Sequence, residues 1–229
     1  MPSLLSAADL RAIPLFAQLS DAQVELLLRG QIGVEVAAEQ VLLLEQDEGE
    51  GLVVILEGLA KVRSYSADGE EAVMAVLGPG DLLGEMAVLT SGVRNADVVA
   101  LTRLLAVKLR ASGYRELLFH DVNLALALAR LLAQRLTTLN RRFLLRGADA
   151  TTRLLATLLQ LALTTSRGKD PLALIPPLPQ RELAAMAGLS RETTSRTVTQ
   201  LRERGMVIGD PQGMRIAELQ CLRKRGLLA

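Results

Sequence analysis

Between Val41 and Lys108 the chain is a series of short apolar segments, each closed by a turn sequence. The segments are Leu52–Leu56, Leu59–Arg63, Ala72–Leu77 and Val98–Val107. They are separated by Gly49-Glu50-Gly51, Asp68-Gly69 and Gly78-Pro79-Gly80-Asp81. Segments this short, with glycine and aspartate at the breaks, are typical of strands joined by tight turns. The region therefore predicts an antiparallel barrel or sandwich.

Helical periodicity flanks this region on both sides. Residues from about Ser6 to Arg29 are expected to be helical, with Ser20 and Asp21 as a cap before an apolar face. From Asp121 to about Arg146, apolar residues recur every three or four positions, at Leu128, Leu132, Leu136, Leu139 and Phe143. Such a stripe needs a partner surface, either in its own domain or on the same helix of a second subunit. Because neither flanking region obviously covers it, we expect a homodimer.

The last third of the chain has the pattern of a winged helix-turn-helix. A helix is expected from about Ala150 to Thr164, followed by a polar break. Gln180–Ala187 and Ser190–Arg204 predict two helices joined by a turn at Gly188, and residues 207–216 predict a short hairpin. The expected fold class is α+β, with an N-terminal β domain at 1–120, a dimerisation helix at 121–146 and a winged helix-turn-helix domain at 147–229.

Charge and composition limit the partners. Residues 1–146 carry 14 Lys and Arg against 18 Asp and Glu, whereas residues 147–229 carry 12 against 7, so the C-terminal part suits a polyanion. Cys221 is the single cysteine and His120 the single histidine. One thiol cannot build a four-thiolate zinc or iron–sulfur site in one chain, and a lone histidine is a poor basis for haem sensing. No apolar run is long enough to cross a bilayer. We expect a cytoplasmic protein without metal, haem, iron–sulfur cluster or membrane partner.

Residues 83–96 contain the parts of a small anion site. Gly84 allows close approach of the backbone, the turn after it can present N–H groups, and Arg94 offers a fork for phosphate. The Glu85 carboxylate can accept hydrogen bonds from ribose hydroxyls. Each residue also has an ordinary explanation, as a turn glycine or a charge on a solvated loop. From the residues alone, both interpretations remain open.

The second helix of the helix-turn-helix carries the chemistry for reading base edges. Arg191, Glu192 and Arg196 fall on one exposed face, where arginine can bond to guanine and glutamate to cytosine. Phosphate contacts are expected from Gln180, Arg181, Ser190 and Thr193. In isolation, the charged face would be read as surface ion pairs. An aromatic content of 2% gives little support to base stacking on single strands.

Both regions resemble one family, the cyclic-AMP receptor protein and FNR regulators. Gly84-Glu85-x-Ala87-x-Leu89, with Arg94 and Ala96 after it, resembles the phosphate-binding cassette of cyclic-nucleotide-binding domains, and residues 78–81 resemble the turn before it. Residues 184–196 resemble the family's recognition helix with its preceding turn. The resemblance covers nearly the whole chain. It implies a β-roll, a long dimer helix and a winged helix, in that order.

The family also implies a role for each matching residue. Arg94 would grip the cyclic phosphate and Glu85 the ribose 2′-hydroxyl, within a nucleotide site that includes Gly84, Met86, Ala87 and Asn95. Asn95 departs from the small or hydroxyl-bearing residue that is usual there. The family's Thr-Ser contact to adenine falls near Thr138 and Asn140, where this chain also departs from the pattern. The implied ligand is cyclic AMP, the implied DNA half-site resembles TGTGA paired with TCACA, and the implied protein partner is RNA polymerase.

The most consistent interpretation is a ligand-responsive transcription regulator and not an enzyme. Within the family, the ligand could instead be a cyclic dinucleotide or another metabolite, or DNA binding could be independent of ligand. An enzyme gated by a nucleotide domain is disfavoured, because the C-terminal part shows no nucleophile–base pair or metal constellation.

Overall fold

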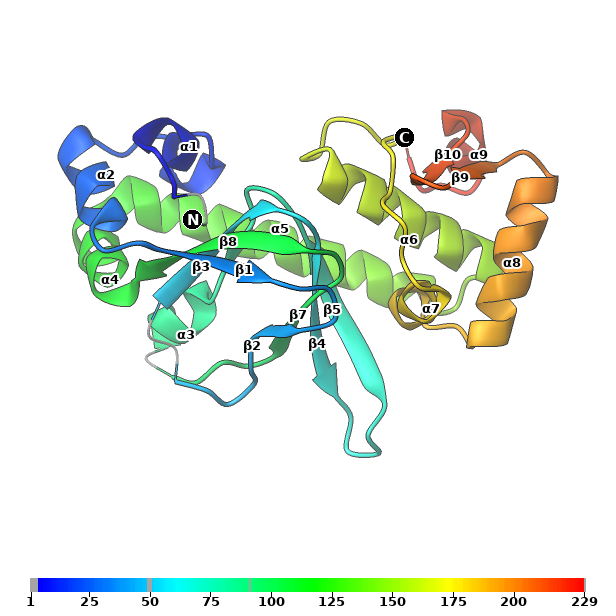
Figure 1. Ribbon diagram of the computed structural model, residues 1–229, viewed down its shortest axis with the longest axis horizontal. Coiled ribbons are helices and arrows are strands. Elements are labelled where there is room, and N and C mark those ends of the chain that lie inside the picture. Colours follow the sequence, from blue (N-terminus) through cyan, green and yellow to red (C-terminus); the bar gives the residue numbers. More distant parts are fainter. Residues whose placement is uncertain (1–3, 49–50, 91, 229) are drawn as a thin grey trace. The chain divides into compact units, whose positions relative to one another are not determined.

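The computed structural model describes residues 4–48, 51–90 and 92–228, which form two compact units (Figure 1). One unit contains the chain up to Ala60 together with Leu77–Leu139. The other contains Lys61–Val76 together with the chain from Asn140 onward. Among the described helices, none is long and apolar enough to span a membrane.

The strands of the N-terminal half form two four-stranded sheets within the described residues, in the orders β1-β8-β3-β6 and β2-β7-β4-β5. The strands are β1 (Ile32–Val36), β2 (Val41–Leu43), β3 (Gly51–Glu57), β4 (Ala60–Tyr65), β5 (Glu71–Leu77), β6 (Leu82–Leu83), β7 (Asp97–Ala100) and β8 (Leu104–Arg110). β3 pairs antiparallel with both β6 and β8. The predicted antiparallel architecture is therefore confirmed.

Two details of the sheets differ from the prediction. Val98–Val107 is not one strand, because the chain turns between β7 and β8. At that turn the Leu101 N–H donates to the carbonyl of Leu59, and the Thr102 hydroxyl accepts from the Leu59 N–H at 3.0 Å. β1 was not predicted, because it lies before Val41, where the predicted strand region begins. Gly49 and Glu50, part of a predicted turn, lie outside the described residues.

Short helices cover one end of the first unit (Figure 1). They are α1 (Ala7–Arg11), the 3₁₀ turn η1 (Pro14–Phe16), α2 (Asp21–Leu28), α3 (Glu85–Thr90) and α4 (Ala111–His120). The region predicted as helical from about Ser6 to Arg29 is thus divided into α1, η1 and α2. Pro14 begins η1, and α2 begins separately at Asp21. The predicted cap at Ser20 is confirmed, because its hydroxyl accepts from the Gln23 N–H in a capping box.

A single apolar core ties these helices to the sheet. Phe16 and Tyr114 are fully buried and meet edge to face, with ring centroids 6.1 Å apart. Leu52 and Leu109 from β3 and β8 belong to the same cluster. Leu82 of β6 and Val88 of α3 also belong to this cluster, so the core holds the start of the loop at residues 83–96.

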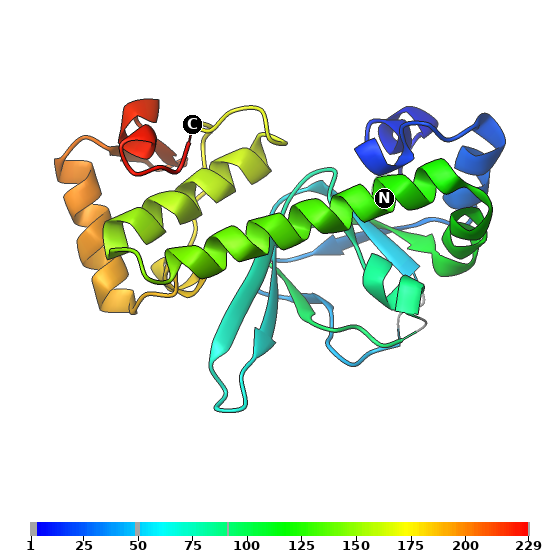
Figure 2. The same ribbon diagram turned by 180° about the vertical axis from the view of Figure 1, so that it is seen from behind.

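The long helix α5 (Val122–Leu145) runs without interruption (Figure 2). The Asp121 carboxylate starts it by accepting hydrogen bonds from the N–H groups of Asn123 and Leu124. Its first half buries Leu124 and Leu128 in the core of the first unit. Further along, Leu136 and Phe143 are 58% and 67% exposed in the single chain. Only part of the predicted apolar stripe is therefore covered within the chain.

The second unit contains a helix-turn-helix followed by a hairpin. Its remaining elements are α6 (Ala150–Thr165), α7 (Gln180–Ala187), α8 (Arg191–Glu203), β9 (Val207–Asp210), β10 (Gly213–Ile216) and α9 (Leu219–Arg223). α6 packs against both α7 and α8. Gly188 joins α7 to α8 with φ +61°, a left-handed conformation that favours glycine. The predicted α+β fold with a winged helix-turn-helix is confirmed.

Candidate nucleotide site and DNA interface

The loop at residues 83–96 folds as a tight turn and a short helix. The chain leaves β6 at Leu83, turns at Gly84 with φ +84°, and enters α3 at Glu85. A Cβ at Gly84 would collide with the guanidinium of Arg94 and lie 2.8 Å from the carbonyl oxygen of Gly51. Only glycine fits here, because both the backbone angle and the space exclude a side chain. We refer to residues 84–96 as the cassette.

Arg94 is the buried cation of the cassette. Its side chain is almost fully enclosed, with the residue 7% exposed. Nη1 donates to the carbonyl oxygen of Gly84 at 3.1 Å, and Nη2 donates to that of Gly51 at 2.7 Å. Burial lowers the pKa of Arg94, while the carboxylates of Glu85 and Asp47 oppose that shift. A positive charge held in a fixed place with little water around it favours an anion beside it.

Glu85 is the first residue of α3 and pairs with Arg135, which was not among the residues predicted from the sequence. It is 3% exposed, and its Oε1 is 2.6 Å from Nη1 of Arg135 on α5. Arg135 also donates to the carbonyl oxygen of Leu82. Helical spacing could have indicated Arg135 from the sequence, because it lies three residues before Thr138 and so at a neighbouring position on the same face of the helix.

The other residues predicted to bind the nucleotide differ in their burial and in the unit to which they belong. Ala87 is buried in α3, whereas Met86 is exposed and its sulfur accepts from the Asn95 amide at 3.6 Å. Thr138 is exposed, and its hydroxyl donates to the carbonyl of Gln134 in its own helix. Asn140 is also exposed and belongs to the second unit. Ser91 lies outside the described residues. The structure thus gathers Gly84, Glu85, Arg94 and Arg135.

Helix α8 separates a buried face from a charged one. Thr194, Val198 and Leu201 are buried, whereas Arg191, Glu192 and Arg196 are all exposed. The Ser190 hydroxyl caps the helix by accepting from the Thr193 N–H at 3.1 Å, as predicted from the sequence. A helix anchored on one side can present the opposite side to a groove.

Helix α7 presents its first residues to solvent and is supported from behind. Gln180 and Arg181 are exposed, while Glu182 is buried. At the other end, Arg142 donates to the carbonyl of Met186 at 3.1 Å, and Arg153 donates to that of Gly188 at 3.0 Å. Burial lowers the pKa of Arg142, and the nearby charge of Arg146 lowers it further. These arginines, which were not predicted, brace the turn of the helix-turn-helix.

The single cysteine and histidine have local roles. Cys221 is buried and its thiol donates to the carbonyl of Glu218 at 3.0 Å. Burial raises the pKa of that thiol, and Glu218 raises it further, so the reactive thiolate is disfavoured. Nδ1 of His120 lies 2.8 Å from the carbonyl oxygen of Glu116 in the same helix. Within the described part of the chain, no group of three or more His, Cys, Asp or Glu residues could hold a metal ion.

Two family models match the chain. A cyclic nucleotide-binding domain matches residues 33–121, and a Crp-like helix-turn-helix domain matches residues 152–225. The first match contains the cassette, and the second contains α7 and α8. Together they define a DNA-binding transcription regulator that carries a cyclic-nucleotide-binding domain.

Known relatives identify the family. The chain is 32% identical over 216 residues to the cyclic AMP receptor protein of Thermus thermophilus, covering 94% of this chain and 97% of that relative. It is 28% identical to a CRP-like cAMP-activated global transcriptional regulator of Mycobacterium tuberculosis, covering 79% of this chain and 82% of the relative. The chain therefore belongs to the CRP/FNR family of transcription regulators, and it is not an enzyme.

Solved structures show the same fold. FixK2 from Bradyrhizobium japonicum is similar with a TM-score of 0.74 and 21% identity, covering 87% of this chain and 98% of that one. The regulator CLP of Xanthomonas campestris, described as c-di-GMP responsive, has a TM-score of 0.66 and 20% identity, covering 87% of this chain and all of the other.

Proposed function

We propose that the chain is a cyclic-AMP-controlled regulator that acts as a homodimer on an inverted DNA repeat. The observation that carries this proposal is the cassette, where the buried guanidinium of Arg94 and the buried carboxylate of Glu85 lie around Gly84. An anionic phosphate suits the first group, and ribose hydroxyls suit the second. Relatives whose names include cyclic AMP support this ligand.

Within the proposed site, each residue has a distinct task. Arg94 takes the cyclic phosphate, and Glu85 takes the ribose 2′-hydroxyl. The backbone of Gly84, Met86 and Ala87 approaches the phosphate, and Asn95 lines the same loop. Thr138 and Asn140 remain our proposal for the base. Arg135 holds Glu85 and so sets the direction in which its carboxylate points.

The proposed dimer forms along α5. The stripe that includes Leu136, Leu139 and Phe143 is apolar and exposed in the single chain. Large apolar side chains at helical spacing are covered well by the same stripe of a second copy. A dimer with two-fold symmetry then places two recognition helices about one helical turn of DNA apart, roughly 34 Å.

The proposed DNA site is an inverted repeat with TGTGA-like half-sites. Arg191 and Arg196 each take a guanine, and Glu192 takes a cytosine. Contacts to phosphate come from Gln180, Arg181, Ser190 and Thr193, and these position the protein without reading sequence. The regulator then works in the cytoplasm and acts with RNA polymerase.

One experiment tests both halves of this proposal. Calorimetry compares the binding of cyclic AMP, cyclic GMP and cyclic di-GMP, and fluorescence anisotropy measures DNA affinity with and without each one. We expect cyclic AMP to bind and to raise the affinity for the inverted repeat. If only another nucleotide bound tightly, the ligand would not be cyclic AMP. Equal DNA affinity with and without each nucleotide would exclude control by any of them.

A further inference from the structure

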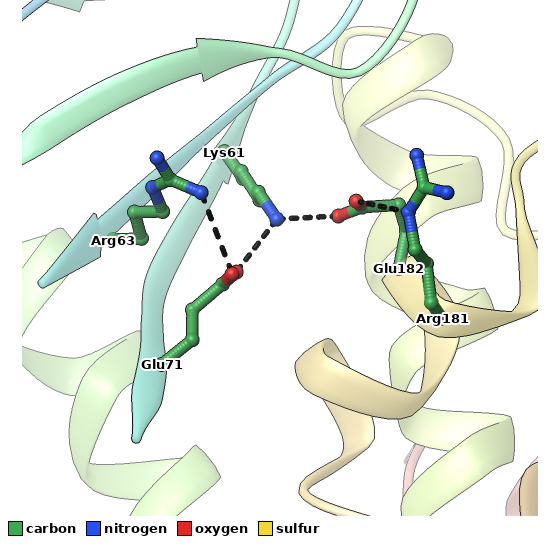
Figure 3. Close-up of polar contacts among 5 residues, drawn as sticks. All are labelled: Lys61, Arg63, Glu71, Arg181 and Glu182. Carbon is green, nitrogen blue, oxygen red and sulfur yellow. Dashed lines mark hydrogen bonds and ion pairs between the residues drawn. The ribbon is translucent and has the colours of Figure 1, made fainter. Parts of the chain in front are cut away.

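A buried ion-pair network connects the β4–β5 hairpin to the first helix of the helix-turn-helix (Figure 3). Lys61 on β4 is 3% exposed, and its Nζ is 2.6 Å from Oε1 of Glu71 and 2.6 Å from Oε2 of Glu182. We call these three residues the Lys61 bridge. Two arginines extend the network, since Arg63 lies 3.5 Å from Glu71 and Arg181 lies 3.6 Å from Glu182.

The partners of Lys61 come from different functional parts of the sequence. Glu71 is on β5, and the whole hairpin falls inside residues 33–121, which match the cyclic nucleotide-binding domain. Glu182 is in the first turn of α7, inside the matched helix-turn-helix. By its packing, the hairpin belongs to the same compact unit as that helix-turn-helix. An element of the sequence that matches the nucleotide-binding domain thus packs in the same compact unit as α7.

The hairpin is also close to the cassette along the chain. β5 ends at Leu77, and only the turn at residues 78–81 and the short strand β6 separate it from Gly84. A movement of the cassette therefore has a short covalent route to the hairpin. The route from the hairpin to α7 is the Lys61 bridge.

Burial makes the bridge a discrete contact rather than a weak surface attraction. A buried ammonium group is strongly unfavourable without a carboxylate partner, so the loss of its pairing is accompanied by a change in the local packing. Exposed ion pairs, by contrast, form and break at little cost. A contact with two distinct arrangements can pass on a change at one end to the other end.

We propose that the Lys61 bridge couples the sensor domain to the helix-turn-helix, so that nucleotide and DNA influence each other through Lys61 and Glu182. Arg181, our proposed phosphate contact, shares the Glu182 carboxylate. A phosphate at Arg181 draws that guanidinium away from Glu182 and changes the charge balance around Lys61. The nucleotide arm of this proposal rests on the proposed control by cyclic AMP, whereas the DNA arm rests on the proposed phosphate contact at Arg181 and is independent of cyclic AMP.

The first test uses DNA alone, with hydrogen exchange of residues 61–76 as the readout. In the full-length wild type, a duplex carrying the inverted repeat is expected to change exchange in the hairpin by severalfold. Lys61→Met and Glu182→Gln should each abolish that change, and the double variant should add nothing. Glu71→Gln is the matched control, since it removes a carboxylate from the same lysine without touching α7. Hydrogen exchange in the hairpin that does not change on DNA binding, or that changes equally in wild type and Lys61→Met, would overturn the proposal.

The second test measures how many fold cyclic AMP changes DNA affinity. Couplings of this kind are commonly about 5- to 150-fold. In Lys61→Met and Glu182→Gln, we expect cyclic AMP to change DNA affinity by no more than about twofold, while both variants bind the nucleotide as the wild type does. Glu71→Gln should keep the full change in DNA affinity. An unchanged factor in both bridge variants would refute the bridge while leaving ligand control intact. Cyclic AMP could leave the DNA affinity of the wild type unchanged while DNA still changes hydrogen exchange in the hairpin, with that change lost in Lys61→Met. The proposed control by cyclic AMP then fails and the bridge stands.

Folding of the variants is checked by circular dichroism and thermal unfolding. Glu182→Gln keeps a hydrogen-bond acceptor for Lys61 and is the milder substitution, so it decides the test if Lys61→Met does not fold. Lys61→Arg keeps the charge and should restore part of the coupling. A Lys61→Arg variant no better coupled than Lys61→Met would show that packing, and not the ion pair, transmits the effect.

Discussion

Arg135 and Glu85 form an ion pair with 2.6 Å between Nη1 and Oε1, and it joins the long helix α5 to the cassette. Glu85 is buried while Arg135 is partly exposed, so the glutamate depends on the arginine for its charge balance. The carboxylate that we propose for ribose is therefore positioned by the helix that we propose for the dimer.

This pair predicts a specific pattern of stability. Arg135→Gln leaves the Glu85 carboxylate buried without its ionic partner and should lower the free energy of unfolding by about 1–3 kcal/mol. The double variant with Glu85→Gln should recover part of that loss, because the buried charge is then removed. Urea unfolding at fixed protein concentration compares the wild type, Arg135→Gln, Glu85→Gln and the double variant. Additive losses in the double variant would show that the two side chains are not energetically coupled.

Arg94→Gln should affect both binding and folding. Loss of a charge-assisted phosphate contact is expected to weaken cyclic AMP binding by about 2–4 kcal/mol. The same change removes hydrogen bonds to Gly51 and Gly84, so the melting temperature should also fall. Arg94→Lys, which keeps the charge without the fork, should be intermediate in calorimetry. Wild-type affinity for the nucleotide in Arg94→Gln would contradict the assigned role.

The dimer is best tested at residues that the chain itself leaves exposed. Leu132 packs partly against the core of its own unit, so Leu132→Glu would also damage the monomer. Leu136→Glu combined with Phe143→Glu avoids that problem and should produce monomers, since charges buried in the seam are unpaired. Sedimentation velocity at micromolar concentration gives the answer. A monomeric wild type would exclude a constitutive dimer.

Two arginines should differ in how they contribute to DNA binding. Arg191→Ala is expected to cost about 1–3 kcal/mol and to relax preference at one base pair. Arg181→Ala should weaken all sequences alike and reduce the salt dependence of binding. Selection from random duplexes, followed by salt titrations, separates the two effects. A selected palindrome without guanines facing Arg191 and Arg196 would contradict the assignment of the recognition helix.

The cap of α6 predicts a dependence on pH. The Asp149 carboxylate accepts from the hydroxyl and N–H of Thr152, and these bonds with the Arg225 charge hold its pKa below the usual value of 3.8. Its stabilising effect is therefore present above that value and is lost as the pH falls through the lowered pKa. Asp149→Ala should cost about 1 kcal/mol at pH 7. In thermal unfolding, the melting temperatures of Asp149→Ala and wild type should differ less near pH 3 than at pH 7. An equal difference at both pH values would argue against this cap.

The sequence alone determined those features that depend on neighbouring residues. Ser20 and Ser190 cap their helices through groups three residues away, and Gly188 makes its turn with its own backbone angle. The spacing of Glu85 and Arg94 lies within one loop. Such features are local in the chain, so the order of residues is sufficient to predict them.

Only the tertiary structure decided which distant residues meet. Arg135 reaches Glu85 across 50 positions of sequence, and Lys61 reaches Glu182 across 121. The same holds for the break between β7 and β8, where Leu101 and Thr102 turn toward Leu59. Local patterns say that these side chains are charged or apolar, but their partners follow from how helices and sheets pack. The loop at residues 84–96 and the helices of the helix-turn-helix were therefore predictable as elements, whereas the contacts that hold and connect them were not.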